Sequence, residues 1–292
     1  MVTHSSNLQM STTKNLLENL DWNQFTLEQL KQIQSEVGKA IHQKQSSLHS
    51  TDRKSSEISN YKASVAKVFP SHLRNSLTDY QRCIFLISLG SKNFIQSNRL
   101  TACIQWINQN FQTCTVIIGD SLYRLTLEVR HQSAGETALQ EALQAGEEFI
   151  NQNQHYFESS AQKCQFQFKR TSELERIHNT HFTGYYQQLE NLYQNHASFQ
   201  AMVNRFSQAY LNRGKEIKID PGKEDKRQET SLANTYCLEE SALLACLVEE
   251  QDSPFIYPGS IKIFEEISEG LHPEVPDSLQ RMIWVSLRLK KK

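Results

Sequence analysis

Two short apolar runs, separated by one helix-length segment, constrain the fold of this chain more than any other feature. The first run is Cys83–Ile87, the second is Thr115–Gly119, and Leu100–Phe111 lies between them. Short, almost wholly apolar runs are typical of parallel strands that are buried on both faces. Strand, helix and strand over about forty residues form a βαβ unit, whose right-handed crossover brings both strand ends to one edge of a parallel sheet. Ligands of open α/β sheets bind at that edge.

The segments that follow fit the same α/β plan. Residues 136–150 predict a helix with an acidic face, and Cys164–Phe168 alternates like a strand. Ser172 and Glu175 are spaced as a capping box ahead of a long helical region that reaches about Leu211. We further expect a surface loop at 214–230, a helix at 232–248 and a strand at 254–257.

The first sixty residues predict an extension outside this domain. Apolar residues recur at three- and four-residue steps from Leu27 to Ile41, behind Thr26 and Gln29, which are spaced as a capping box. The stretch 43–59 is rich in Ser, Lys and Gln and predicts a linker or a frayed helix end. We therefore divide the chain into a polar helical extension, 1–60, and a single α/β domain, 61–292.

Composition excludes several classes of protein. With 31 Lys and Arg against 32 Asp and Glu, the chain is no uniformly basic nucleic-acid binder, although a local basic patch is compatible with these totals. No apolar run approaches the roughly 18 to 20 residues that cross a bilayer, so no membrane association is expected. The six cysteines form no C-x-x-C pair, which indicates reduced thiols of a cytoplasmic protein and neither a metal site nor a disulfide framework.

Three clusters carry candidate chemistry, each beside a plainer interpretation. Ser88 leaves the first buried run ahead of a Gly-containing turn that exposes its hydroxyl, although a Ser there is more often a helix cap. Tyr236 and Glu240 share one helix face in apolar surroundings, where Glu240 binds an ammonium group or else is solvated. Tyr257 precedes a proline that holds it extended at the end of the last strand, or is an ordinary strand terminus.

In this order the motifs resemble the tRNA-dependent cyclodipeptide synthases. The resemblance runs from about Tyr80 to Gly259 and rests on Ser88 within Ile87–Ser91, Gln105-Trp106 and Phe111 ahead of Val116–Asp120, Tyr236-x-x-x-Glu240, and Tyr257-Pro258. Ser91 and Pro258 stand where one subfamily has Asn and His, so the chain is similar to the subfamily with Tyr-Pro.

The resemblance implies a Rossmann-like domain similar to the catalytic domain of class I tyrosyl- and tryptophanyl-tRNA synthetases. It also implies an aminoacyltransferase that joins the amino acids of two aminoacyl-tRNAs into a cyclic dipeptide, as a monomer and with no ATP or metal cofactor. Ser88 would be the nucleophile, Tyr236 and Glu240 would hold the amino group, and Tyr257 would assist ring closure. The implied substrate-binding residues are Ile84, Leu86, Ser91, Ile117, Gly119, Leu243 and Phe255 for the first substrate, with Asn212 and Arg213 beside the second.

One feature departs from the better-studied branch of the family, which has a basic helix for tRNA where this chain has the acidic stretch Glu136–Phe149. We expect that stretch to face away from tRNA. The alternative docking residues are Lys62, Lys67, Arg74, Arg124, Arg130, Lys169, Arg170, Lys215, Lys218 and Lys290–Lys292. The main rival function is a non-catalytic tRNA- or nucleotide-binding module on the same scaffold. A helical interaction protein and a serine hydrolase fit less well, because the chain has buried strands and no ordered His/Asp partnership.

Overall fold

The computed structural model describes residues 24–26, 29, 60–131, 135–160, 163–212 and 223–292. It divides the chain into two units, Met1–Ile58 and Ser59–Lys292. In the first unit, the Thr26 N–H donates to Gln29 Oε1 over 2.9 Å and the Gln29 N–H donates to Thr26 Oγ1 over 3.3 Å, which confirms the capping box. The rest of the helix expected at 27–41 and the linker at 43–59 lie outside the described residues, and the division at residue 60 stays a prediction.

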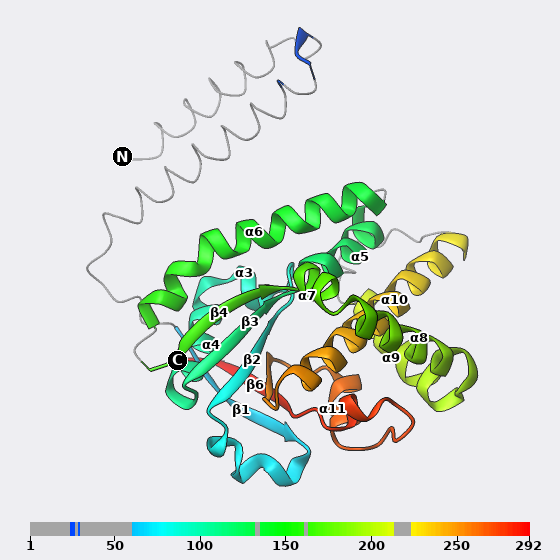
Figure 1. The fold of residues 1–292 in the computed structure, drawn as a ribbon. Coiled ribbons are helices and arrows are strands. Elements are labelled where there is room, and N and C mark those ends of the chain that lie inside the picture. Colours follow the sequence, from blue (N-terminus) through cyan, green and yellow to red (C-terminus); the bar gives the residue numbers. More distant parts are fainter. Residues whose placement is uncertain (1–23, 27–28, 30–59, 132–134, 161–162, 213–222) are drawn as a thin grey trace. The chain divides into compact units, whose positions relative to one another are not determined.

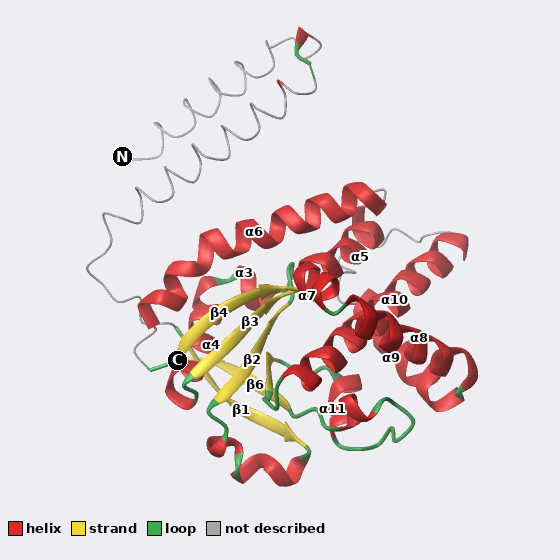
Figure 2. Cartoon of the chain, in the orientation of Figure 1, coloured by secondary structure: helices red, strands yellow, loops and turns green. Residues whose placement is uncertain are grey.

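A six-stranded sheet forms the centre of the second unit (Figures 1 and 2). Its order is β1-β6-β5-β2-β3-β4, with strands β1 (Tyr61–Phe69), β2 (Arg82–Ile87), β3 (Thr113–Ile118), β4 (Gln165–Arg170), β5 (Phe255–Pro258) and β6 (Trp284–Lys291). All neighbours pair in parallel except β1, which runs antiparallel to β6 at the edge. The expected α/β fold is confirmed, with an antiparallel edge strand that the sequence analysis did not predict.

The βαβ unit is present as expected. Strands β2 and β3 pair in parallel along their whole lengths, from Arg82 opposite Thr113 to Ile87 opposite Ile118. They are joined through α3 (Lys92–Ile95) and α4 (Ser97–Asn110), and α4 buries an apolar face that includes Leu100, Ile104 and Ile107. Both strands are buried because their residues are apolar on each face of the sheet.

The strand order contains a topological switch point between β2 and β5. From β2 the chain adds β3 and then β4 on one side, and afterwards adds β5 and then β6 on the other. Loops that leave adjacent strands in opposite directions open a crevice at the carboxyl ends of those strands, where open α/β sheets bind ligands. Ser88 directly follows β2 and Tyr257 lies in β5, so the fold brings two of the candidate residues to this crevice.

Helices surround the sheet. The remaining helices are α5 (Asp120–His131), α6 (Gly135–Ser160), α7 (Thr171–Ile177), α8 (Asn179–Asn195), α9 (Ala197–Asn212), α10 (Lys223–Glu250), α11 (Lys262–Ser268) and α12 (Asp277–Gln280), with 3-10 turns at Ser71–Asn75 and Leu77–Asp79. Figure 1 shows α8, α9 and α10 packed beside one another, and α10 carries the predicted Tyr236 and Glu240.

The long helical region expected to reach about Leu211 is present and ends at Asn212, divided into three helices because the chain leaves helical geometry at His178 and His196. The capping box expected of Ser172 and Glu175 was wrong, since the Ser172 hydroxyl donates to Asp120 Oδ2 over 2.8 Å and Glu175 accepts a bond from Ser121. The Asp120 carboxylate, which directly follows Gly119 at the end of β3, binds both the hydroxyl and the N–H of Ser172, and sequence spacing does not reveal it.

The surface loop expected at 214–230 was also wrong in its second half. Residues 223–230 form the first turns of α10, while 213–222 lie outside the described residues. The segment after Gly222 is rich in Lys, Glu, Arg and Gln, which have good helix propensity as well as high polarity. Its polarity predicted a loop, whereas its propensity favours an exposed helix.

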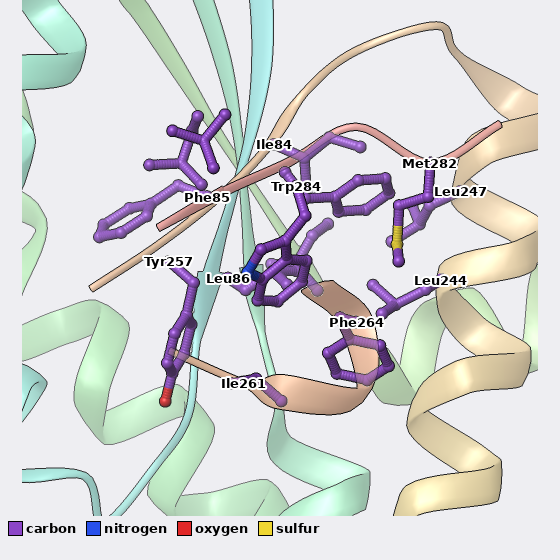
Figure 3. Packing of buried hydrophobic residues seen from close by; sticks show 14 of the residues in the cluster. Ile84, Phe85, Leu86, Leu244, Leu247, Tyr257, Ile261, Phe264, Met282 and Trp284 are labelled. Atoms are coloured by element: carbon purple, nitrogen blue, oxygen red, sulfur yellow. The ribbon is translucent and has the colours of Figure 1, made fainter. Parts of the chain in front are cut away.

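The core lies between the sheet and the helices on both its faces. Figure 3 shows Trp284 and Phe264 packed closely, with ring centroids 5.0 Å apart, beside Leu244 and Leu247 of α10. Strand β6 brings Trp284 into this core fully buried, and the sequence analysis overlooked the short apolar run Met282–Val285 that leads into this strand. Among the described residues, no helix has both the length and the hydropathy needed to cross a membrane.

Candidate active site at the switch point

Ser88 begins a tight turn after β2. The Ser91 N–H donates to the Ser88 carbonyl oxygen over 3.2 Å, and Gly90 adopts a φ of +79°. A side chain at Gly90 would also approach the Tyr123 ring to 3.1 Å, so both conformation and space favour glycine here. Ser91 then caps α3, since its hydroxyl accepts the Asn93 N–H. The turn holds the Ser88 hydroxyl at the switch point.

Tyr257 reaches Ser88 from the neighbouring strand. Its hydroxyl donates to Ser88 Oγ across 3.4 Å, a contact between residues that lie 169 positions apart in the sequence. The Tyr257 ring is buried, with 7% of the residue exposed, and packs against Phe94 and Trp284 at centroid distances of 6.0 Å each. In Figure 3 the Tyr257 hydroxyl points out of the apolar cluster.

Tyr236 and Glu240 face Ser88 from α10, and all three line one pocket. Burial raises the pKa of the Tyr236 phenol well above its usual value, and the nearby Glu240 carboxyl raises it further, while a hydrogen bond with Ser88 opposes the rise. Tyr236 is therefore a neutral phenol at any physiological pH and acts as a hydrogen-bond donor. Glu240 is buried, at 8% exposure, and the described residues that line the pocket include no Lys, Arg or His.

The pocket has a mostly apolar wall. Four of the residues proposed for the first substrate line it, namely Leu86, Ile117, Gly119 and Leu243. Ile84 and Phe255 do not; they are fully buried and lie opposite each other in the β2–β5 ladder, as core residues. The remaining wall, which the sequence did not single out, consists of Ile87, Leu122, Thr171, Leu244 and Leu247.

Thr171 belongs to a buried polar network at the ends of β3 and β4. Its hydroxyl donates to Asp120 Oδ1 over 2.9 Å and accepts the Ser121 N–H over 3.1 Å, while the Ser121 hydroxyl, whose proton goes to Glu175, lies 2.8 Å from it. Asp120 is fully buried and also accepts from Arg170 Nε over 2.6 Å. Because the only proton of the Thr171 hydroxyl goes to Asp120, this residue has no hydrogen-bond donor left for the pocket.

Three charged groups adjoin that network. Arg124 forms a bidentate ion pair with Glu239, at 2.6 and 2.8 Å, and donates to the Ser121 carbonyl. Glu175 accepts the Ser121 hydroxyl at 2.5 Å. Burial raises the pKa of Glu175 from 4.5 to about 7, with the Ser121 bond and Arg124 opposing and Glu239 and Asp120 adding to the rise. In the sequence, the signal for this cluster is that Glu239 directly precedes the candidate residue Glu240.

Asn212, one of the two proposed second-substrate residues, does not line the pocket. Asn212 is exposed at the end of α9, and Arg213 lies outside the described residues. The same helix does supply Phe206 and Tyr210, whose rings stack with Tyr236 at 6.1 and 5.0 Å. The side of the site next to Tyr236 is thus aromatic, a feature that the sequence analysis missed although the residues are spaced i and i+4.

The candidate basic residues differ in what they contact. Within the described part of the chain, ion pairs occupy Arg124, Lys169 and Arg170. In contrast, Lys62 and Lys290 are directly opposite each other on β1 and β6, and the next pair on that face includes Arg288. All three side chains are exposed, with Lys291 and Lys292 exposed beside them. We call this group, Lys62, Arg288 and Lys290–Lys292, the basic ribbon.

The basic ribbon extends past the active edge of the sheet. Strand β6 runs parallel to β5 and is level with Pro258 at Leu287. It continues beyond that level to Lys291, roughly 13 Å further at about 3.3 Å per residue. Like charges placed directly opposite each other in a ladder are destabilising, which favours an anionic partner on this surface.

Among the described residues, no group of three or more His, Cys, Asp or Glu is arranged to hold a metal ion.

Comparison with known proteins gives a consistent result at the level of the fold. No protein-family model matches the sequence, and neither does any curated protein. Solved structures do match: a CDPS from Fluoribacter dumoffii is 21% identical, with a TM-score of 0.64 over 80% of this chain and 99% of that chain. A cyclodipeptide synthase from Candidatus Glomeribacter gigasporarum bound to Phe-tRNAPhe is 16% identical, with a TM-score of 0.55 over 76% of this chain and 92% of that chain.

A third similar structure is a Mycobacterium tuberculosis protein, described as demonstrating that cyclodipeptide synthetases are related to type I tRNA synthetases. It is 11% identical, with a TM-score of 0.56 over 80% of this chain and 94% of that chain. The chain therefore has the fold of the cyclodipeptide synthases, the family that its motifs resemble, and the expected relation of that fold to class I synthetases is confirmed.

Proposed function

We propose that this protein is a tRNA-dependent cyclodipeptide synthase, an aminoacyltransferase that converts two aminoacyl-tRNAs into a 2,5-diketopiperazine. The observation that carries the proposal is the convergence of Ser88, Tyr236, Glu240 and Tyr257 on one pocket at the switch point. These residues come from β2, α10 and β5, far apart in sequence, and a module that only binds tRNA does not require a nucleophile together with proton-relay groups. The shared fold supports the proposal.

The first step is acyl transfer to Ser88. Its Oγ attacks the ester carbonyl of the first aminoacyl-tRNA, the bond from that carbonyl to the ribose oxygen breaks, and the serine proton passes to the departing ribose oxygen. No imidazole lines the described pocket, so the vicinal ribose hydroxyl relays this proton. Backbone N–H groups of the turn at Gly90 stabilise the oxyanion. The Ser91 N–H already donates to the Ser88 carbonyl oxygen, so it is a poor donor for the oxyanion.

Glu240 and Tyr236 hold the α-amino group of the bound aminoacyl moiety. A hydrogen bond between a carboxylate and an ammonium contributes about 1.5 to 3 kcal/mol, and it fixes the direction in which the amino acid points. Glu240 is buried in the pocket that Ser88 lines, and a carboxylate at this place complements the ammonium group of a bound aminoacyl moiety. Once that ammonium loses a proton, which Glu240 accepts, the amine attacks the ester carbonyl of the second aminoacyl-tRNA. The bond from that carbonyl to the ribose oxygen breaks, the second tRNA leaves with a proton from the amine on that oxygen, and a dipeptidyl-Ser88 remains.

Tyr257 acts in the last step. The free amine of the dipeptide attacks the Ser88 ester carbonyl, the ring closes, and the serine oxygen leaves with a proton. A phenol with a reference pKa of about 10 is a poor free base, so Tyr257 donates a hydrogen bond and relays the proton to Ser88 Oγ. The 3.4 Å contact between the two hydroxyls is short enough for such a relay after a small adjustment.

The pocket wall indicates an apolar first amino acid. Apart from Ser88, Tyr236 and Glu240, its side chains are Leu, Ile and Thr171, and the Thr171 hydroxyl donates its only proton to Asp120. A polar or charged substrate side chain would lose its hydration without gaining a partner, at a cost of several kcal/mol for a charge. We therefore assign Leu-, Met- or Phe-like side chains to this position.

We place the acceptor stem of tRNA on the basic ribbon, Lys62, Arg288 and Lys290–Lys292. The ribbon projects beyond the carboxyl edge on which Ser88 lies, whereas Arg124, Lys169 and Arg170 are occupied by acidic partners. Neutralising phosphates makes affinity fall steeply with salt. The proposal further includes a monomer without ATP or metal cofactor, in the cytoplasm, where the six free and buried cysteines remain reduced.

Covalent labelling tests the proposal. Total bacterial tRNA charged with a mixture of ¹⁴C-labelled amino acids is mixed with the full-length protein, and the protein is denatured in acid and counted. We expect label that is stable in acid, released by mild base and absent from Ser88→Ala. A protein that shifts charged tRNA in a native gel but takes up no label would instead be the rival binding module.

A further inference from the structure

The β2–β5 ladder ends before it reaches the catalytic residues. The backbone pairs of these strands stop at Phe85 opposite Ile256, so the ladder itself does not fix the spacing between Ser88 and Tyr257. Yet the contact between their hydroxyls is 3.4 Å, at the outer limit of a hydrogen bond. A further connection between the two strand ends is needed to keep them from spreading.

Asn93 supplies that connection. Its Nδ2 donates to the Pro258 carbonyl oxygen over 2.8 Å, across 165 positions of sequence. Pro258 directly follows Tyr257, and Asn93 lies in α3, at the end of the turn that begins at Ser88. The bond therefore joins the segment that carries the nucleophile to the segment that carries the tyrosine, at the level where the backbone ladder has stopped.

The orientation of the Asn93 amide is itself fixed. Its Oδ1 accepts from Arg99 over 2.9 Å, and the Arg99 guanidinium lies over the Tyr61 ring at 5.0 Å. Because arginine only donates, it selects the oxygen of the amide and leaves the NH₂ group to face Pro258. The Asn93 N–H is bonded to the Ser91 hydroxyl as well. Next to Asn93, the Phe94 ring packs edge-on against the Tyr257 ring at 6.0 Å.

We infer that Asn93 is a positioning residue for Tyr257, held by Arg99, and that it serves the ring-closing step more than the acylation of Ser88. The inference rests on the proposed function, since it assigns Asn93 to one step of that reaction. Asn93 touches neither hydroxyl, and acts through Pro258. Acylation of Ser88 does not use the Tyr257 hydroxyl, whereas ring closure needs Tyr257 at the correct distance from Ser88 Oγ.

The variant Asn93→Asp tests this with little change in shape. Aspartate keeps the oxygen that faces Arg99 but replaces the NH₂ donor by an oxygen that repels the Pro258 carbonyl. The matched control is Gln96→Glu, the same amide-to-carboxylate change on an exposed residue of the same segment, which adds the same charge near the tRNA substrate. Both variants are compared with the wild type in full-length protein by thermal melting, to confirm folding.

Two readouts follow in each protein. With the mixed ¹⁴C-aminoacyl-tRNA, we expect Asn93→Asp to label Ser88 within about 2-fold of the wild-type rate, but to release cyclic dipeptide roughly 10- to 100-fold more slowly, with dipeptidyl-enzyme accumulating. With 3-fluorotyrosine incorporated, the ¹⁹F resonance of Tyr257, assigned by its loss in Tyr257→Phe, should shift in Asn93→Asp and stay in place in Gln96→Glu.

The outcomes separate the inference from the function beneath it. An unmoved Tyr257 resonance, or equal losses of labelling and ring closure, would overturn the positioning role of Asn93 while leaving the enzyme a cyclodipeptide synthase. A wild-type protein that neither takes up label nor releases cyclic dipeptide would overturn the proposed function, and the assignment of Asn93 to ring closure with it.

Discussion

Glu175 should make the stability of this protein depend on pH in a defined direction. Burial raises the pKa of its carboxyl from 4.5 to about 7 in the folded protein. The folded state then binds this proton more tightly than the unfolded state, so the stabilisation is complete below the unfolded pKa and is lost as pH rises through about 7. Between pH 5.5 and pH 8.5 the two pKa values correspond to a loss of about 2 kcal/mol of unfolding free energy.

The variant Glu175→Gln isolates this contribution. Glutamine resembles the protonated acid in shape, and its amide oxygen still accepts the Ser121 hydroxyl. We expect the unfolding free energy of the wild type, relative to Glu175→Gln, to fall by about 2 kcal/mol from pH 5.5 to pH 8.5. Urea unfolding at both pH values, followed by circular dichroism, measures the difference because all other titrating groups are common to both proteins.

The control is Glu141→Gln, on the exposed face of α6, which removes a carboxyl of the same type from the surface. Its stability relative to the wild type should change little with pH. If the wild type and Glu175→Gln instead keep a constant difference, the Glu175 carboxyl is ionised in the folded protein throughout this range. The description of Arg124, Glu239 and Asp120 around a protonated Glu175 would then be wrong.

Four further substitutions test three separate parts of the structure. Gly146→Ala should lower stability by about 1 to 2 kcal/mol, since its Cβ would lie 2.7 Å from Asp120 Cβ, whereas Gly184→Ala, with nothing within 4 Å, should stabilise by up to about 1 kcal/mol; thermal melting compares them, and equal effects would contradict the close approach. Tyr257→Phe should leave Ser88 labelling largely intact and slow diketopiperazine release; abolished labelling would refute that division of roles. Glu240→Gln should weaken retention of the aminoacyl group, with dipeptide formation falling about 10- to 100-fold in single-turnover assays, and an unchanged rate would remove Glu240 from amine binding.

Local sequence patterns predicted the centre of the fold. The runs at β2 and β3 are strands that must be apolar on both faces, and Tyr257 precedes a proline that ends a strand, so each is visible in a few consecutive residues. Strand β1 escaped prediction because it lies at the edge of the sheet, where most of its side chains are half-buried or exposed. Strand β6 lies between β1 and β5, and it was missed because its lysines indicated a polar tail.

Some residues of the site could not be assigned from the sequence. Ile84 and Phe255 were assigned to the pocket, yet strand pairing places them opposite each other in the core. Thr171 and Asp120 gave no signal, because the contact between them depends on the β3–β4 register and not on spacing along the chain. Asn93 was missed for the same reason, since its partner Pro258 lies on a strand that reaches it only through the sheet order.

The most direct test of the central claim is mass spectrometry of the medium from bacteria that express this chain. The account predicts a new cyclic dipeptide with at least one apolar residue, absent from cells that express Ser88→Ala at the same level. No new diketopiperazine, or one that persists with Ser88→Ala, would contradict it.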